Sequence, residues 1–237
     1  MRWADSAPIF GDRMDSPVVH PPGVGWLRLA ATRLRTLLLA KTVGITVAMA
    51  AFFTAYFWLL NHARQPVTTV PRIFIDRMIG FEPRAVVLYA SLWPYVTLAP
   101  ALLTSRRELA SYAWAAVAMS IVGFGTFILW PTAVPRPDFD VALHPSLATL
   151  KAVDASGNAF PSLHVAFAVF SAAWLGRLLR AMGAGVLARA ANWIWCLGIV
   201  YSTLAIRQHV ALDAVSGALL GAAVAAAHFR ALGPMRA

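Results

Sequence analysis

Charged side chains and cysteine are both scarce in this sequence. Only 13% of its 237 residues are charged and 59% are hydrophobic, with a mean hydropathy of +0.66, whereas a soluble globular domain has roughly 25% charged residues. The shortage of charge argues against a soluble cytosolic domain and excludes a disordered chain. Cys196 is the single cysteine, which excludes an intrachain disulfide and a thiolate metal site.

Acidic residues are the scarcer of the two charged classes. The chain has 10 Asp and Glu residues against 20 Lys and Arg residues, which gives a formal net charge of +10. A basic balance of this size is typical of nucleic-acid-binding proteins, but here the basic residues form no single stripe. They lie between long apolar runs, where they meet anionic lipid head groups and set the topology. The sequence therefore predicts membrane lipids as partners, and no nucleic acid.

Six apolar segments dominate the rest of the chain, and most reach the ~20 residues that a membrane-spanning helix needs. They cover residues 36–60, 85–103, 109–130, 160–179, 191–206 and 210–229, and we expect the fifth to begin earlier, near Gly185. We therefore predict an all-α integral membrane fold, a bundle of six transmembrane helices without an internal repeat. Gly217 and Gly221, four residues apart in the sixth segment, pack helices either within one monomer or between copies.

These segments divide the chain into three regions. Residues 1–35 are expected to form a cytoplasmic tail, whose end at 26–35 is either a basic amphipathic helix on the membrane surface or a simple flanking cluster of charge. Residues 36–230 form the six-helix domain, and residues 231–237 a cytoplasmic C-terminal tail. With the amino terminus inside, thirteen of the 20 Lys and Arg residues fall on the cytoplasmic face and seven on the outer face. The positive-inside rule then predicts that both termini are cytoplasmic.

Three polar clusters mark helix ends on the predicted outer face, and their residue types suit phosphate. In the first cluster Arg136 stands between Pro135 and Pro137, which restrict its backbone, and its guanidinium can bind two phosphate oxygens at once. Taken alone, a loop arginine that contacts lipid phosphates is the alternative.

The second cluster precedes the fourth apolar segment. Pro161 suits the first turn of a helix, and free amides of Ser162, Leu163 and His164 at that helix amino terminus favour an anion. Ser162 adds a hydroxyl, and His164 adds a titratable proton. The alternative is a helix cap beside an incidental interfacial histidine.

The third cluster contains Ser202, Arg207, His209 and Asp213. His209 and Asp213 are four residues apart, so on a helix they share a face and the carboxylate can accept a hydrogen bond from the imidazole. An ionisable residue inside an apolar span is costly and is usually functional. A purely structural bond between the two side chains is the alternative.

The three clusters, in this order, resemble the signature of the type 2 phosphatidic acid phosphatase superfamily, also called lipid phosphate phosphatases. That signature reads Lys, six residues, Arg-Pro; then Pro-Ser-Gly-His; then Ser-Arg, five residues, His, three residues, Asp. The matching residues are Arg136, Pro137, Pro161, Ser162, His164, Ser202, His209 and Asp213. The resemblance covers about residues 85–229. The clusters look most like the branch that includes inositol phosphorylceramide synthases, which contains phosphotransferases as well as phosphatases.

Three positions depart from this signature. Leu129 stands where the family has its lysine, Leu163 replaces the glycine, and Thr203 replaces the arginine, so two phosphate-binding cations are missing. If the fifth helix continues past Ile206, Arg207 lies on the same face as Thr203 and supplies a guanidinium. The alternative is that Arg207 caps a helix carboxyl terminus.

The resemblance implies a two-step displacement at phosphorus. His209, oriented by Asp213, attacks phosphorus to form a phosphohistidine, and His164 donates a proton to the departing oxygen. The expected phosphate-binding residues are Arg136, Ser162, Leu163, Ser202 and Arg207. No metal or other cofactor is expected, because the possible metal ligands show no recognisable ligand spacing. Those possible ligands are Asp138, Asp140, His144 and Asp154.

A site at the bilayer surface favours a lipid phosphate as substrate, namely a glycerolipid, sphingolipid or polyprenyl phosphate or diphosphate. The first expectation is a metal-independent lipid phosphatase, and the second is a phosphotransferase that uses an alcohol acceptor. The third is a non-catalytic phospholipid carrier or flippase. The expected location is the inner (plasma) membrane of a bacterium, with the active site on the periplasmic or extracellular side.

Overall fold

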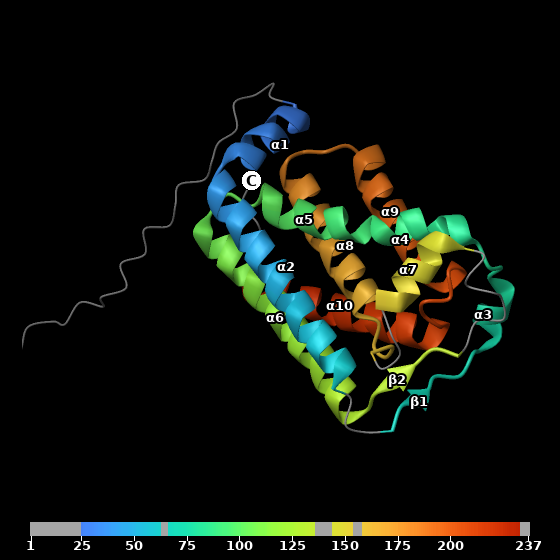
Figure 1. Cartoon of the computed structure of the whole chain (residues 1–237). Coiled ribbons are helices and arrows are strands. Elements are labelled where there is room, and N and C mark those ends of the chain that lie inside the picture. The colour runs from blue at the N-terminus through green and yellow to red at the C-terminus, as the bar shows by residue number, and fades with distance from the viewer. Residues whose placement is uncertain (1–24, 63–65, 136–143, 154–157, 233–237) are drawn as a thin grey trace, which may run out of the picture.

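The structure of the chain is a computed structural model, which describes residues 25–62, 66–135, 144–153 and 158–232. Within those residues it is a bundle of helices with a two-stranded parallel ladder at its edge (Figure 1). In chain order the elements are α1 (Trp26–Arg35), α2 (Leu38–Asn61), β1 (Thr68–Thr69), α3 (Phe74–Met78), the 3-10 turn η1 (Pro83–Ala85), α4 (Val86–Ala90), α5 (Leu92–Leu102), α6 (Arg106–Leu129), β2 (Thr132–Ala133), α7 (Pro145–Val153), α8 (Leu163–Ala181), α9 (Val186–Ala205) and α10 (Ala211–Leu232).

Five helices in the described part of the chain are long and apolar enough to cross a membrane. They are α2, the stretch Pro83–Leu102, α6, α8 and α10, and they indicate an integral membrane protein. α9 has 20 residues but is not among the five, because Arg189 and Asn192 lower its hydropathy. The structure thus supports five of the six predicted spans. The sixth span and the cytoplasmic position of both termini stay predictions.

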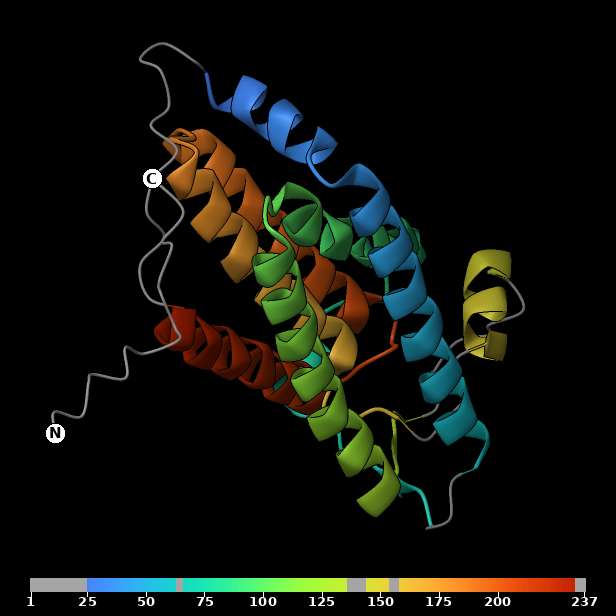
Figure 2. The same cartoon turned by 90° about the vertical axis from the view of Figure 1, so that its left-hand side faces the viewer.

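α8 lies at the centre of the bundle and α2 at its edge. In the apolar 18-residue stretch of α8, 72% of the residues are buried inside the bundle, against 6% in the corresponding stretch of α2. α10, α9 and α5 pack around α8, whereas α2 runs beside α6 along one side of the molecule (Figure 1, Figure 2). The exposed apolar surface that α2 keeps is the one expected of a helix that faces hydrocarbon.

The contact between α8 and α10 depends on two glycines of α10. A Cβ at Gly217 would collide with the carbonyl oxygen of Ser162, and a Cβ at Gly221 would collide with the carbonyl oxygen of Ala166. Only glycine allows two helix backbones to approach so closely. Both glycines therefore pack helices within the monomer, and they bring the start of α8 against the start of α10.

The segment 26–35 forms α1, which is separate from α2 because Leu37 between them has a left-handed backbone with φ 53°. Lys41 of α2 fastens α1 to the bundle. Its ammonium group donates to the carbonyl oxygens of Arg33 at 2.6 Å and Ala101 at 2.7 Å, which lie near helix carboxyl ends, where a cation is favoured. The predicted helix is present, and its place on the membrane surface stays a prediction.

The short ladder gathers three chain segments at one end of the bundle. β1 and β2 are parallel, with Thr68 opposite Thr132, and Asn158 forms a bridge with Thr132. The hydroxyl of Thr132 accepts a hydrogen bond from the amide of Phe160 at 2.7 Å. The ladder therefore fixes the segments that lead into α3 and α8.

Candidate active site

The turn between α9 and α10 presents His209. α9 has ended before Arg207, which adopts a left-handed backbone with φ 59°. The amides of Gln208 and His209 both donate to the carbonyl oxygen of Thr203, each at 3.0 Å. α9 thus ends at the predicted place, and the condition under which Arg207 would share a face with Thr203 is not met, because the carbonyl group of Thr203 holds this turn instead of a further turn of helix.

The structure brings His209 and Asp213 together. Nδ1 of His209 lies 2.8 Å from Oδ2 of Asp213, and Oδ1 of Asp213 accepts from the amide of Val210 at 2.7 Å. The two residues do not share a helical face as predicted, since His209 precedes α10 and the carboxylate reaches it while capping the helix. Asp213 is fully buried. When Nδ1 donates to this carboxylate, the ring keeps a lone pair on Nε2 for attack on an electrophile.

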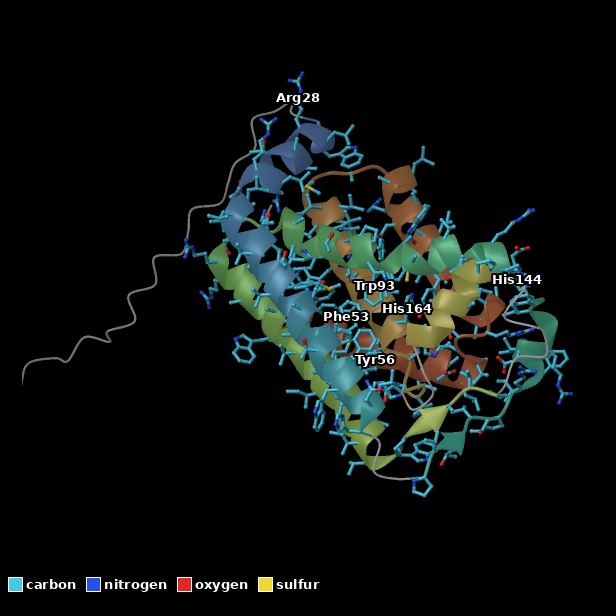
Figure 3. All side chains as sticks on the ribbon, in the orientation of Figure 1. Arg28, Phe53, Tyr56, Trp93, His144 and His164 are labelled. Atoms are coloured by element: carbon cyan, nitrogen blue, oxygen red, sulfur yellow. The ribbon has the colours of Figure 1, made fainter. Side chains whose placement is uncertain are left out.

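His164 lies in the first turn of α8, among aromatic rings (Figure 3). Its imidazole stacks on Tyr89 with ring centroids 3.9 Å apart and meets Trp93 edge-on at 5.8 Å. It lines the same cavity as His209. Among the described residues its Nε2 is buried without a hydrogen-bond partner. A buried polar atom in this state is costly, so a ligand that completes it is expected.

The amino terminus of α8 is already occupied by the protein. The amide of Ser162 donates to the carbonyl oxygen of Asp213 at 2.9 Å, and its hydroxyl accepts from the amide of Val165 at 3.2 Å. The prediction of a free amide at Ser162 is therefore wrong, and the helix-cap alternative describes this residue. Pro161 precedes the cap instead of lying in the first helical turn, and the peptide bond between Phe160 and Pro161 is cis.

An aromatic cavity of about 110 Å³ adjoins the two histidines. Its walls come from α2, α4, α5, α7 and α8 and consist of Phe52, Phe53, Tyr56, Phe57, Tyr89, Leu92, Trp93, Leu150, Asn158, Leu163 and Phe167. His164 and His209 complete the lining, so both imidazoles border the same space. In Figure 3 the side chains of Phe53, Tyr56 and Trp93 point toward one another beside His164. The aromatic cavity suits an apolar group held next to an imidazole.

A second, narrower hollow also borders His209. Its lining consists of Arg72, Asp76, Val134, Pro135, Arg207, His209 and Val210. We term it the cationic hollow, since its described lining contains two arginines, Arg72 and Arg207, and one acidic residue, Asp76. In the described part of the chain, His209 is the one residue that lines both hollows. An anion in the cationic hollow and an apolar group in the aromatic cavity therefore border the same imidazole.

Asp76 and Arg207 fasten the segment around α3 to the turn before α10. Oδ1 of Asp76 accepts from the amide of Ala211, and Oδ2 accepts from the amide of Ile73, each at 2.7 Å. Arg207 donates to the carbonyl oxygens of Asp76 at 3.0 Å and Ile79 at 2.8 Å. Arg207 thus caps the carboxyl end of α3, and the capping alternative is the one observed.

The other predicted phosphate ligands differ in their positions. Ser202 is fully buried, lines neither hollow, and donates to a carbonyl oxygen of its own helix at 2.6 Å. Leu163 lines the aromatic cavity. At the two family positions that lack a cation, Thr203 is fully buried and Leu129 is 81% exposed at the end of α6. Arg136 lies outside the described residues.

The described part of the chain contains no group of three or more His, Cys, Asp or Glu residues that could hold a metal ion. Of the four possible ligands named from the sequence, His144 is described, and its ring lies edge-on to Phe81 at 5.3 Å. Asp138, Asp140 and Asp154 lie outside the described residues.

Arg72 and Asp76 were not expected from the sequence clusters. One signal points to Arg72, because the pattern Thr-x-Val-Pro-Arg occurs twice, at 68–72 and at 132–136. The two copies contain β1 and β2, which pair with each other. The expectation of no internal repeat is thus wrong for this five-residue unit, which is far shorter than the repeats that build whole domains. No comparable signal points to Asp76.

Comparison with known proteins bears on the region that holds the histidines. The family model described as the PAP2 superfamily matches residues 108–234, which contain α8, α9, α10 and the pair of His209 and Asp213. No curated protein and no solved structure matches the chain significantly. Members of this superfamily are generally phosphatases or phosphotransferases that act on phosphate esters. Because the match covers more than half of the sequence, the chain belongs to the PAP2 superfamily.

Proposed function

We propose that this protein is a membrane-bound lipid phosphatase that cleaves a phosphate monoester or diphosphate through a phosphohistidine at His209. The observation that carries the proposal is the position of His209, which borders both hollows and is held through Nδ1 by the buried carboxylate of Asp213. An amphiphile with its apolar chain in the aromatic cavity and its phosphate at the cationic hollow has its phosphorus next to Nε2.

In the first step, Nε2 of His209 attacks phosphorus while the bond between phosphorus and the leaving oxygen breaks. Asp213 stabilises the positive charge that develops on the imidazole. His164, which lines the same cavity, gives its proton to the departing oxygen. The products are the released lipid group and phosphohistidine.

In the second step, water attacks the phosphohistidine. The water gives a proton to His164, the bond between phosphorus and Nε2 breaks, and inorganic phosphate leaves. Each role in this scheme belongs to a side chain of the protein, so we propose a metal-independent reaction. Treatment with a chelator should leave the rate unchanged, whereas a loss that a divalent ion restores would contradict this part of the proposal.

We assign the site to the outer face of the inner membrane of a bacterium, with six spans, α9 as the fifth, and both termini in the cytoplasm. The distribution of Lys and Arg supports this orientation. Further support comes from the ladder and α3, which lie toward one end of the bundle (Figure 1), and from the bond of Asp76 in α3 to Ala211, two residues after His209. A site at the end of a bundle meets lipid phosphates at head-group level.

A phosphotransferase that passes the phosphoryl group to an alcohol is the second candidate. The sequence of residues 160–164 looks like the branch that includes inositol phosphorylceramide synthases. Leu163, which stands at the family's glycine position, lines the aromatic cavity beside His164. An apolar side chain next to the general base favours an alcohol with an apolar part over water as the second nucleophile.

The test uses purified protein and a panel of glycerolipid, sphingolipid and polyprenyl phosphates. Release of inorganic phosphate without an acceptor supports the phosphatase, whereas transfer that depends on an added alcohol supports the phosphotransferase.

His209→Ala should lower turnover by at least about 10⁴-fold while the protein stays folded, and labelled substrate should leave no adduct on it. His144→Ala, which changes an imidazole that lines neither hollow, is the matched control. Lipid transport without any hydrolysis or transfer would instead indicate a carrier.

A further inference from the structure

We propose that Arg72 binds the phosphate of the substrate beside His209. Its guanidinium replaces one of the two phosphate-binding cations of the family that this chain lacks. The proposal rests on the function proposed above. Leu129, at the lysine position, is exposed at the surface of the bundle, and Thr203, at the arginine position, is fully buried. Neither side chain carries a charge, so a phosphate dianion requires cations from other parts of the molecule.

Arg72 lines the cationic hollow together with His209 and Arg207. It lies ahead of residues 108–234, the region that the family model matches, so the family likeness does not assign it. A guanidinium offers paired N–H donors that fit two oxygens of a phosphate group. Arg207 donates to the carbonyl oxygens at the end of α3, and Arg72 is the other arginine among the described residues that line the hollow with His209.

The backbone on both sides of Arg72 is fixed. Two residues ahead, the amide of Val70 donates to the carbonyl oxygen of Ala133 at 2.9 Å and continues the ladder. One residue after it, the amide of Ile73 donates to Oδ2 of Asp76 at 2.7 Å. Asp76 is in turn bonded to the first residue of α10. The backbone of Arg72 is therefore held on one side by the ladder and on the other side by Asp76, which lines the hollow.

The second copy of the Thr-x-Val-Pro pattern forms another part of the same hollow. Val134 and Pro135 line it, and they hold the places in their copy that Val70 and Pro71 hold in the first copy. Because β1 and β2 are parallel and in register, the two copies present equivalent residues at the same end of the ladder. Arg72 thus lines the hollow at the same end of the ladder as Val134 and Pro135 of the second copy.

The carboxylate of Asp76 also lines the hollow and opposes an anion. It is only 3% exposed, and its two oxygens accept hydrogen bonds from the backbone amides of Ile73 and Ala211, which offset its charge. Among the described residues that line the hollow, two arginines outnumber this one acidic residue. Because the hollow is narrow and contains no water-sized space, binding of a phosphate there requires its lining side chains to move apart.

The test compares wild-type protein with Arg72→Ala, Arg72→Lys and the control Arg77→Ala. Arg77 is an exposed arginine of α3, and it lines neither hollow. Two quantities are measured on the full chain: kcat/KM for a lipid phosphate, and the Kd of inorganic phosphate by titration calorimetry. Arg72→Ala should lower kcat/KM by about 10²–10³-fold, the loss typical of one positioned donor, and raise the Kd by at least about 10-fold. Arg72→Lys should fall between, and Arg77→Ala should stay within about twofold of wild type.

The two measurements separate this proposal from the proposed function. If Arg72→Ala matches Arg77→Ala in both, Arg72 is not a phosphate ligand, and the phosphatase proposal stands. If the wild-type protein binds phosphate through Arg72 and cleaves no ester, Arg72 is a phosphate ligand and the phosphatase proposal is wrong. If it neither binds phosphate nor cleaves an ester, both are wrong. Arg72→Gln, which keeps most of the side-chain length without the charge, carries the same test if thermal unfolding shows that Arg72→Ala is not folded.

Discussion

Residues 108–234 and residues 25–107 contribute different parts of the candidate active site. The first region, which the family model matches, contains the two histidines and Asp213. The second region contains Arg72 and Asp76 of the cationic hollow, and α2, α4 and α5 within it supply most of the aromatic wall. In our proposal the reacting groups therefore come from one region, and the groups that recognise the substrate come largely from the other.

The two regions also differ in how far the bundle encloses them. α8 carries His164, and 72% of its apolar 18-residue stretch is buried. α2 carries four of the aromatic wall residues, and 6% of its apolar stretch is buried. A reacting imidazole must keep its geometry, and a tightly packed helix holds it. In our proposal an apolar chain enters from the bilayer, and a wall on a helix as exposed as α2 gives it a route. The difference in enclosure matches the difference in proposed role.

The largest expected effect concerns the region of the reacting groups. In Asp213→Asn the side-chain oxygen can still accept from the amide of Val210, but the new NH2 group faces Nδ1 of His209. The imidazole proton then moves to Nε2, and the lone pair needed for attack is lost. We expect kcat to fall by about 10⁴-fold, as in comparable histidine–carboxylate pairs. Turnover of a lipid phosphate measures the loss, and thermal unfolding controls for folding. A decrease of less than about 10-fold would mean that the carboxylate does not set the tautomer.

The next effect concerns the junction between the two regions. Asp76→Ala removes the carboxylate that accepts hydrogen bonds from the amides of Ile73 and Ala211, which belong to different regions. Both amides then lose this hydrogen bond. We expect a loss of about 2–4 kcal/mol in the free energy of unfolding, and a larger change in kcat than in KM, because the turn that carries His209 loosens. Denaturant unfolding and steady-state kinetics measure the two quantities.

Arg77→Ala is the matched control for that experiment, since Arg77 is the exposed neighbour of Asp76 in α3. It should unfold like the wild-type protein. If Asp76→Ala also unfolds like the wild-type protein, other contacts join the two regions, and Asp76 does not position the reacting turn.

The sequence predicted the reacting residues better than the recognition residues, and the physical reason is distance along the chain. His209 and Asp213 are four residues apart, so a local pattern is enough to pair them. The bond between Asp76 and the amide of Ala211 joins residues 135 positions apart, and no local pattern contains it. Arg72 belongs to the same long-range arrangement, and the repeated Thr-x-Val-Pro-Arg pattern is the one signal of it in the sequence.

Local reasoning could not decide the conformation at Arg207. Ile206, Arg207 and Gln208 are all compatible with a helix, so the sequence left open whether the fifth helix continues past Ile206 or Arg207 caps a helix end. The guanidinium of Arg207 instead bonds carbonyl oxygens at the end of α3, and the amides that follow bond to Thr203. These tertiary contacts support a left-handed backbone that helix propensity disfavours. The five apolar spans were predictable because a run of apolar residues is a local property.

The smallest expected effect separates the chain of the substrate from its phosphate. Phe53 lines the aromatic cavity and packs against Trp93 with ring centroids 4.8 Å apart, so Phe53→Ala removes part of the wall without touching a reacting group. We expect kcat/KM for a long-chain lipid phosphate to fall roughly 10-fold, which corresponds to about 1.4 kcal/mol of lost apolar contact. For a short, water-soluble phosphate ester it should change by less than about twofold. Phe74→Ala, at a phenylalanine that is 74% exposed and outside both hollows, should alter neither. If both substrates lose activity equally, the wall supports the histidines instead of the chain, and the two regions do not divide the work as proposed.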